Sequence, residues 1–348
     1  MTTIDPDQLT CPLPGAETER VLLGHGSGGR LMADLLATVI TGELGEPGPL
    51  EDAALIGGDL VVSTDGFVVT PRFFPGGDIG SLAVHGTVND LAMRGARPIA
   101  LTLAYVLEEG LPLAELREIT ASVAAAARDC GVRVVTGDTK VVGRGAADGC
   151  YLTTTGIGRR LPSATPTAAG GVPGDVVLLS GPIGAHGTAI LSVREGLGFE
   201  ADIRSDSRPL HRLVAAMVEA GGHEVHALRD PTRGGLASAL NELAESSDVT
   251  VEIDEPGLPV PAAVASACEL LGLDPLHVAN EGCLVAFVAP AAADAVLAAM
   301  RADPAGREAR AIGTVGPPGG PARVVARTLV GSTRVVDMLI GEQLPRIC

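Results

Sequence analysis

One stretch of the sequence, residues 77–107, decides the fold class; it reads GDIGSLAVHGTVNDLAMRGARPIALTLAYVL. Its first part predicts a helix over about 79–94, and the apolar run from Pro98 to Leu107 predicts a buried strand. Outward from this pair, helix and strand patterns alternate without the strict cadence of βαβ units, and several strands arrive in pairs. This arrangement favours an α+β fold with two α/β domains in tandem.

The segments around that stretch set the expected domain limits. Residues 59–71, DLVVSTDGFVVTP, predict two strands joined by a turn at Asp65-Gly66. A Pro/Ala/Gly-rich stretch at 162–174 marks the boundary between the domains. We therefore expect four parts: a mobile N-terminal lead-in (1–20), an N-terminal domain (21–160), a C-terminal domain (170–337) and a flexible C-terminal tail (338–348).

Composition excludes several classes of protein. The chain of 348 residues carries 42 acidic and 25 basic residues, a formal net charge of −17 that repels polyanions and argues against a nucleic-acid partner. The longest apolar stretch, 283–300, is interrupted by Pro290 and Asp294, and the acidic N-terminus does not resemble a signal peptide. The six cysteines form no CxxC pair, which excludes a zinc ribbon. We expect a cytoplasmic protein without a membrane segment.

A glycine-rich loop, GHGSGG at 24–29, lies between an apolar triplet and a helical pattern. It matches G-x-G-x-x-G, but a dinucleotide site also needs a strand that ends in an acidic residue about 20 positions later. Glu43 and Glu46 have that spacing and lie in a Gly/Pro loop instead. The remaining interpretations are a flexible turn and a cradle in which backbone N–H groups bind phosphate.

Aspartates at strand ends and helix starts form a second signal: Asp52, Asp65, Asp78 and Asp90. Several of them interrupt apolar segments, where an unpaired carboxylate is costly. Carboxylates brought together repel one another unless a cation lies between them, and oxygen ligands without His or Cys favour Mg²⁺. Each of them alone is equally explained as a helix cap or a turn residue.

Three further segments combine charged residues with glycine turns. Asp138 and Lys140 in GDTK follow a strand, and Lys140 could contact a phosphate or an acyl oxygen or be a solvated turn residue. Asp230 and Arg233 in DPTRGG are equally typical of a capped helix start. Glu281 precedes an apolar strand, where burial would raise its pKa and suit a general base.

The last residue, Cys348, is the least expected feature. The segment before it, LPRI, follows a glycine- and proline-punctuated tail. A terminal thiol is exposed and mobile by default, and a free thiol is a liability unless it is used. It is either a frayed end or a swinging arm that carries a covalent group.

The chain resembles the HypE family of hydrogenase maturation proteins, which belongs to the superfamily of aminoimidazole ribonucleotide synthetase (PurM-like), selenophosphate synthetase and thiamine-phosphate kinase. The resemblance runs from about residue 20 to the end. It is carried by HGSGGR (25–30), STDGFVVTPRFFPGGDIGSLAVHGTVNDLAMRGARP (63–98), GDTKVV (137–142), DPTRGGLA (230–237), NEG (280–282) and the terminal PRIC (345–348). The GDIG and GTVNDLAM block is specific to the superfamily, and PRIC as chain end to the HypE family.

The resemblance implies an ATP-dependent carbamoyl dehydratase. A carbamoyltransferase, HypF, loads Cys348, the enzyme converts the carbamoyl group to a thiocyanate, and the HypC–HypD complex receives the cyanide for the iron of [NiFe]-hydrogenase. It also implies a homodimer. Cys348, Glu281 and Lys140 would be catalytic, with Glu281 as base and Lys140 as the cation for developing charge. The implied ligands are Asp52, Asp65 and Asp90 for Mg²⁺, and His25, Gly26, Ser27, Gly28, Gly29, Asp65, Asp78, Asn89, Asp138, Asp230 and Arg233 for ATP.

Two alternatives keep other functions open. Another synthetase or kinase of the superfamily, such as selenophosphate synthetase or thiamine-phosphate kinase, would make the terminal cysteine incidental. A non-catalytic thiol carrier in metallocentre assembly would show no ATP turnover when Cys348 is carbamoylated.

Overall fold

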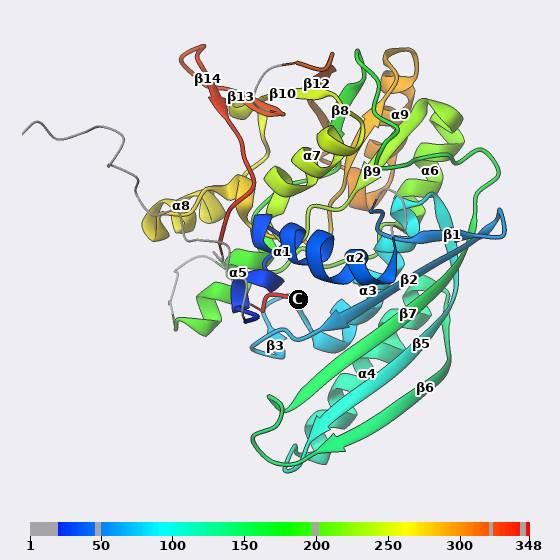
Figure 1. Cartoon of the computed structure of the whole chain (residues 1–348), viewed down its shortest axis with the longest axis vertical. Helices are drawn as coiled ribbons and strands as arrows, with labels where there is room; N and C mark the ends of the chain where they lie inside the picture. Colours follow the sequence, from blue (N-terminus) through cyan, green and yellow to red (C-terminus); the bar gives the residue numbers. More distant parts are fainter. Residues whose placement is uncertain (1–19, 46–49, 197–201, 320–322, 342–345) are drawn as a thin grey trace, which may run out of the picture.

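The computed structural model describes residues 20–45, 50–196, 202–319, 323–341 and 346–348. The expected N-terminal lead-in lies outside these residues except for Arg20. The first domain is built on a five-stranded sheet, lower right in Figure 1, with α3 (Ile79–Met93) and α4 (Leu113–Cys130) packed against it. The sheet order is β1 (Ala54–Ile56), β2 (Leu60–Phe67), β7 (Cys150–Arg160), β5 (Ala96–Glu108) and β6 (Arg133–Val142). Only β5 and β6 are parallel.

The helix α3 is the centre of the first domain. Asp78 caps it by accepting hydrogen bonds from the backbone N–H groups of Gly80 (2.7 Å) and Ser81 (3.2 Å). Glycines let other elements approach closely, since a Cβ at Gly86 would lie 3.0 Å from the ring of Phe67. Twelve of the 15 helix residues are buried, because the sheet, α4 and the second domain surround it.

The predicted turn at Asp65-Gly66 is wrong. These two residues lie inside one continuous strand, β2, which pairs antiparallel with β7 over its whole length. Asp65 pairs with Thr154 and Gly66 with Thr153. An Asp-Gly pair favours a hairpin only where the flanking segments can pair with each other, and here β7 takes that place.

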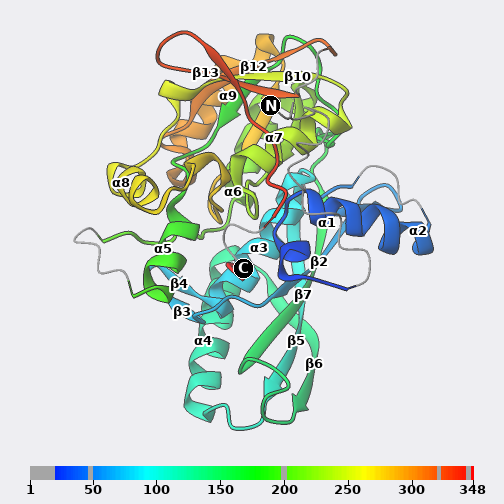
Figure 2. The same ribbon diagram turned by 60° about the vertical axis from the view of Figure 1, so that its left-hand side comes forward.

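The second domain contains a seven-stranded sheet with helices on both faces (Figures 1 and 2). Its order is β14 (Thr333–Val335), β13 (Val324–Arg327), β10 (Thr250–Asp254), β12 (Arg310–Gly316), β8 (Val176–Leu179), β11 (Val285–Val288) and β9 (Val225–Arg229). The helices are α5 (Ala185–Arg194), α6 (His211–Gly221), α7 (Gly235–Ser246), α8 (Ala262–Leu271) and α9 (Pro290–Ala302). Alternate residues of β8 point to opposite faces: Val177 and Leu179 share a core cluster with α7, and Leu178 shares one with α6 and α9.

Shorter elements connect these layers. The helix expected from residue 30 is divided into α1 (Arg30–Leu35), a π-helical turn (Leu36–Ile40) and α2 (Thr41–Leu44). A two-stranded ribbon, β3 (Phe73–Phe74) and β4 (Gly77–Asp78), precedes α3. The 3-10 segments are Leu23–Gly26, Gly222–Glu224, Glu255–Gly257, Pro275–His277 and Pro304–Gly306.

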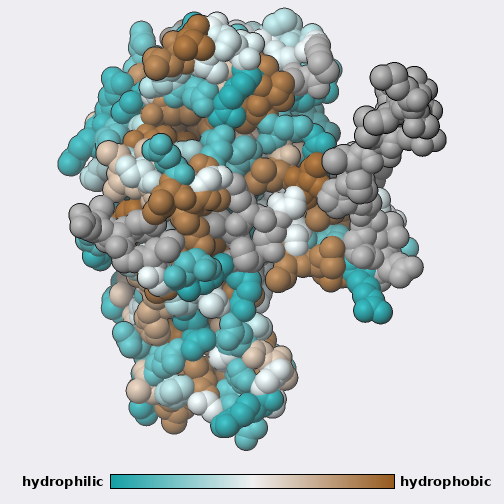
Figure 3. All heavy atoms as spheres, turned by 90° about the vertical axis from the view of Figure 1, so that its left-hand side faces the viewer, coloured by the Kyte–Doolittle hydropathy of each residue, from teal (hydrophilic) through white to brown (hydrophobic). Residues whose placement is uncertain are grey.

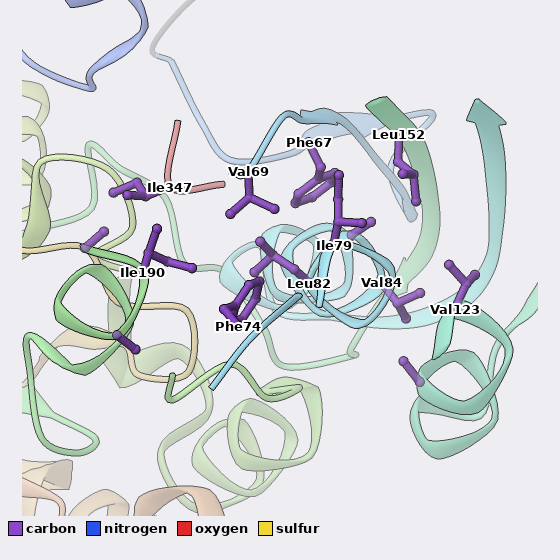
Figure 4. Close-up of a cluster of buried hydrophobic side chains, with 14 of the residues drawn as sticks. Phe67, Val69, Phe74, Ile79, Leu82, Val84, Val123, Leu152, Ile190 and Ile347 are labelled. Carbon is purple, nitrogen blue, oxygen red and sulfur yellow. The ribbon is translucent and has the colours of Figure 1, made fainter. Parts of the chain in front are cut away.

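One hydrophobic core joins the two domains and the chain end. It contains Phe67 and Leu82 from the first domain, Ile190 from α5 and the penultimate residue Ile347, which is 3% exposed. Figure 4 shows Ile347 close to Val69 and Ile190. The letter C in Figure 1, which marks the C-terminal end of the chain, therefore lies at the domain junction, near β3 and α5.

On the face shown in Figure 3, hydrophilic and hydrophobic side chains are mixed over a broad upper and a narrower lower lobe. No helix in the described part of the chain is long and apolar enough to span a membrane.

Candidate active site at the domain junction

Buried carboxylates from both domains gather at the junction. Burial is the main reason that the pKa values of Asp90, Asp230 and Glu281 are raised, and each is raised further by acidic neighbours. The pKa of Asp230 reaches about 8 through burial and the charges of Asp52 and Asp65. Asp65, near the C-terminal end of β2, also has a raised pKa because of burial, although the charge of Arg233 opposes this shift. Such a cluster favours protons or a cation in its midst.

Secondary structure positions each of these side chains. Asp90 lies in the last turn of α3 and accepts a hydrogen bond from the Ser63 hydroxyl of β2 at 2.6 Å. Asp65 accepts one from the N–H of Gly66 at 2.7 Å. Asp230 follows β9 directly, before the loop that leads to α7. The site is therefore assembled from one sheet and one helix of the first domain and from the turns of the second.

The turn that carries Glu281 is rigidly built. The amide of Asn280 accepts from the N–H of Gly184 at 2.6 Å and donates to the carbonyl of Pro231 at 2.9 Å. Asp206 accepts from the N–H groups of Glu281 (3.1 Å) and Gly282 (2.9 Å). A Cβ at position 282 would overlap the Asp206 carbonyl oxygen, so only glycine fits. The Oε1 atom of Glu281 is buried and has no hydrogen-bond partner among the described residues.

Two arginines compensate part of the negative charge. Arg229 forms a partly buried ion pair with Asp52 and, at 3.1 Å, a more exposed one with Glu242. Arg233 is half-buried near Asp65 and Glu281, and donates from Nη1 to the Gly26 carbonyl at 3.0 Å. The resemblance implies Asp52 as a metal ligand, whereas in this structure its charge is already paired with Arg229.

The glycine-rich loop packs against the segment that contains Arg233. Gly28 has a φ of +76°, and a Cβ there would lie 2.7 Å from the Arg233 carbonyl oxygen. The Ser238 hydroxyl donates to the Gly28 carbonyl at 3.1 Å, and the Ser27 hydroxyl to that of Gly24 at 2.7 Å. His25 is buried and accepts at Nδ1 from the N–H of Leu22 at 2.9 Å. The loop thus lies at the rim of the acidic cluster; its contact with phosphates stays a prediction.

The last three residues lie in a seat beside the acidic cluster. The N–H of Val68 donates to the main-chain oxygen of Cys348 at 3.0 Å, and that of Thr70 to the Arg346 carbonyl at 3.2 Å. Burial raises the pKa of the Cys348 thiol to about 12; Arg233 lowers it, and Glu281, Asp65 and Asp90 raise it. The structure shows this one position of the chain end, and the flexibility of the tail stays a prediction.

Four of the expected site residues do not join the cluster in a single chain. Asp78 caps α3 and also accepts a hydrogen bond from the Ser122 hydroxyl at 2.5 Å. Of the two interpretations of Asp78, ligand or helix cap, the structure shows the helix cap. Asp138 and Lys140 pair with each other on the exposed strand β6, with β7 and β5 between them and β2. Asn89 is buried, and its amide holds the Arg208 carbonyl at 3.1 Å and the Leu210 N–H at 2.8 Å. Their roles in ATP binding or catalysis stay predictions.

Two residues that matter here were not predicted from the sequence. Asp206 positions the Glu281 turn, and His186 hydrogen-bonds the Ile347 carbonyl at 2.6 Å. Neither belongs to a local motif. A segment without any periodic pattern surrounds Asp206, and His186 lies on an apolar helix typical of a core.

No three His, Cys, Asp or Glu side chains of the described residues lie close enough together to hold a metal ion by themselves. The donors present are nevertheless carboxylate oxygens with raised pKa values, and one of them lacks a partner. This donor set fits Mg²⁺, which is commonly held by one or two carboxylates together with substrate phosphates and water.

Comparison with known proteins identifies the family of both domains. The N-terminal domain of AIR synthase related proteins matches residues 50–160, and the C-terminal domain matches residues 172–326. Carbamoyl dehydratase HypE of Cupriavidus necator is 54% identical over 94% of this chain and 95% of its own length.

Two crystal structures are also similar. HypE in complex with ATP has a TM-score of 0.81 at 48% identity, covering 94% of this chain and 100% of the other. HypE from a HypE–HypF complex has a TM-score of 0.84 at 44% identity, covering 88% and 99%. The expected two-domain α+β fold and the resemblance are both confirmed, and the chain belongs to the HypE family of carbamoyl dehydratases, enzymes of hydrogenase maturation.

Proposed function

We propose that this enzyme dehydrates a carbamoyl group carried on the sulfur of Cys348 and forms a protein-bound thiocyanate, with ATP as the activating substrate. The observation that carries the proposal is the seat of the C-terminus: backbone hydrogen bonds from Val68 and Thr70 hold it, and the pKa of the Cys348 thiol responds to the charges of Arg233, Glu281 and Asp65. The relative from Cupriavidus necator is named a carbamoyl dehydratase, and a 48% identical HypE was crystallised with ATP.

The proposed reaction removes the elements of water from an S-carbamoyl group. The carbonyl oxygen of the S-carbamoyl group attacks the γ-phosphorus of ATP, the bond from this phosphorus to the β–γ bridging oxygen breaks and ADP leaves. The phosphorylated oxygen is now a good leaving group. The C–O bond then breaks, phosphate leaves and a C≡N bond forms. Of the two protons on the amide nitrogen, one leaves with the phosphate and the other must be taken up by a base.

Glu281 is the candidate base. Its buried, unpartnered Oε1 is free to accept a proton, and its raised pKa brings the carboxylate closer to the range useful at neutral pH. Arg233 lies near both Glu281 and Cys348 and would stabilise negative charge on the transferring group.

Asp65 and Asp90 are the better candidates for Mg²⁺ in this chain, because Asp52 would first have to leave Arg229. When bound, Mg²⁺ neutralises charge on the phosphoryl group that is transferred. The carboxylates in turn would lose the protons that their raised pKa values favour. The glycine-rich loop, His25 to Gly29, would close over the phosphates.

A homodimer formed through β6 would account for Asp138 and Lys140. This strand ends the five-stranded sheet, and its exposed residues include Val134 (41%), Val135 (51%) and Val141 (69%). An open, apolar sheet edge is a liability that a second chain can cover. Dimerisation would give Lys140 access to the partner's site, which it does not reach within its own chain.

We further propose that HypF loads Cys348 and that the HypC–HypD complex receives the cyanide; a HypE–HypF complex structure supports the first of these partners.

The test follows the mass of the C-terminus. Protein carbamoylated by HypF is incubated with Mg²⁺ and ATP, then cleaved after Glu342 to release the segment QLPRIC. We expect this peptide to lose the mass of one water, and the Cys348→Ala variant to bind nucleotide without any such change. ATP hydrolysis with an unchanged peptide mass would refute the proposal, and no ATP turnover at all would favour the non-catalytic thiol carrier.

A further inference from the structure

The C-terminal seat contains a buried histidine that the proposed chemistry does not use. His186 on α5 is completely buried, and its Nε2 lies 2.6 Å from the carbonyl oxygen of Ile347. Its Nδ1 lies 2.8 Å from the hydroxyl of Ser205, and the edge of the ring packs against Phe74 with centroids 5.5 Å apart.

Hydrogen-bond chemistry fixes the state of this ring. A carbonyl oxygen can only accept, so Nε2 must carry the proton and donate it to Ile347. In a neutral imidazole Nδ1 is then the acceptor, and the Ser205 hydroxyl must be its donor. Burial favours the neutral form by lowering the pKa of His186. The ring is therefore oriented in one tautomer with its N–H directed at the backbone of the tail.

The same segment that orients His186 also positions the candidate base. Ser205 is followed by Asp206, whose carboxylate holds the N–H groups of Glu281 and Gly282. The N–H of Ser207 donates back to the Ser205 hydroxyl at 3.1 Å, which makes a tight turn of these three residues. The backbone of the tail and the turn of Glu281 are thus tied to one short piece of chain.

Other contacts hold the residue before Ile347 and set the direction of the tail. Arg194 donates from Nη2 to the carbonyls of Thr70 and Arg346, each at 2.7 Å. The Arg346 guanidinium donates to the Val68 carbonyl at 3.1 Å and pairs with Asp148 at 2.7 Å. These interactions hold Arg346, whereas His186 holds the carbonyl of the residue directly before the thiol.

We propose that His186 is a positioning residue that holds the terminal cysteine in the reactive seat through the Ile347 carbonyl, in register with Glu281 through Ser205 and Asp206. This inference rests on the proposed function, because it assigns the seat to the dehydration step. In this proposal the thiol of Cys348 has two tasks, to accept the carbamoyl group from a partner and to present it for dehydration. Leaving the seat exposes Cys348 to a partner that loads it, and entering the seat aligns the loaded group with the base. A change at His186 should therefore affect the two tasks in opposite directions.

The test measures how often the unmodified tail leaves its seat. Full-length protein without nucleotide is treated with N-ethylmaleimide, and alkylation of Cys348 is followed in the peptide 343–348 released by cleavage after Glu342. We expect His186→Leu to raise the alkylation rate about five-fold, which corresponds to about 1 kcal/mol at 1.4 kcal/mol per factor of ten. His186→Gln keeps an N–H donor near the position of Nε2 and should remain within about two-fold of the wild type.

Two further variants protect the test against a general loss of structure. Thr188→Val alters another completely buried polar side chain of α5, which bonds within the helix to Gly184, and should leave alkylation unchanged. Ser205→Ala removes the donor to Nδ1 and should raise alkylation less than His186→Leu does. Alkylation of His186→Leu at the wild-type rate, or equal acceleration in His186→Leu and His186→Gln, would overturn the proposal.

The catalytic readout separates this inference from the proposed function. In single-turnover experiments, His186→Leu should accept the carbamoyl group at least as fast as the wild type and dehydrate it more slowly. A slower loading step together with slower dehydration would indicate a structural defect and would overturn the positioning role. If the wild type shows no dehydration while His186→Leu still increases the alkylation of Cys348, the proposed function is refuted, but the role of His186 in holding the chain end is supported.

Discussion

Replacing Glu281 by glutamine tests the assignment of the base most directly. Glutamine preserves the length and shape of the side chain and removes its ability to accept a proton. Glu281→Gln should lower the rate of dehydration by about 10²–10⁴, the usual contribution of a positioned general base. This corresponds to about 3–5 kcal/mol in the activation barrier, at about 1.4 kcal/mol per factor of ten.

Although Glu281→Gln should lower the rate, the surroundings of Glu281 predict that it does not lower the stability of the fold. The side chain is 3% exposed, its Oε1 atom is unpartnered, and Asp230, Asp206 and Asp65 are its acidic neighbours. A buried unsatisfied polar atom costs about 1–3 kcal/mol, and the amide group of glutamine can donate to acidic neighbours. We therefore expect the free energy of unfolding of Glu281→Gln to stay unchanged or to rise by about 1 kcal/mol.

Three measurements decide the matter. Urea unfolding gives the stability, calorimetry gives the affinity for ATP, and the mass of the peptide 343–348 gives the single-turnover rate. The wild-type rate should rise with pH as Glu281 loses its proton, whereas the rate of the variant should not depend on this titration. Glu281→Asp serves as the matched control, because it retains the charge and shortens the reach. Dehydration at the wild-type rate, or a loss of activity that only parallels a loss of stability, would refute the assignment.

Other predictions concern the acidic cluster and the thiol. Asp90→Asn should lower Mg²⁺-dependent ATP turnover by about ten-fold or more and raise the thermal midpoint, since one of several repelling charges is removed; unchanged phosphate release would exclude Asp90 from the metal site. Because burial and then the charge of Asp52 raise the pKa of Asp230 to about 8, Mg²⁺ and ATP binding at pH 7 should release protons; calorimetry in buffers of different ionisation enthalpy measures the number, and zero would contradict this. The pKa of Cys348 is raised from 9.0 to about 12, mainly by burial, so docking of the tail should be strongest below pH 9 and weaken as the pH rises toward 12. Alkylation of Cys348 relative to the free hexapeptide should increase over that range, and a constant ratio would contradict the shift.

The sequence predicts regular elements where the local pattern and the tertiary contacts agree. The helix α3 and the strand β5 follow from residues 77–107 alone, because both segments are rich in apolar residues. Twelve of the 15 residues of α3 are buried, as expected, whereas β5 buries only four of its 13 residues and leaves most of the others half-buried. The strand β2 shows the opposite case. Its Asp65-Gly66 pair is typical of a hairpin turn, and only the distant strand β7 makes it a straight strand. A signal confined to neighbours in sequence cannot include a partner about 90 residues away.

The same limit divides the candidate site. Buried carboxylates such as Asp90 and Glu281 interrupt apolar segments, and this contrast is visible in the sequence. The ion pair between Asp52 and Arg229 joins residues 177 positions apart and leaves no trace near either of them. Asp206 and His186 act on the backbone of other segments, so no motif of side-chain types marks them.

The seat and the chemistry of the thiol together imply that the two steps proposed for Cys348, its loading and the dehydration, would occur in different places. In the seat the raised pKa keeps the sulfur protonated, and a thiol is a far weaker nucleophile than a thiolate. Loading of the carbamoyl group therefore requires the tail to be outside. Once the sulfur is acylated it has no proton to lose, so the same burial no longer acts on its ionisation. Burial then favours the second step, since it brings the carbamoyl group to an unpartnered carboxylate and keeps water away from the activated intermediate. A chain end that can leave and re-enter a specific seat would satisfy both requirements, whereas a fixed thiol would satisfy only one.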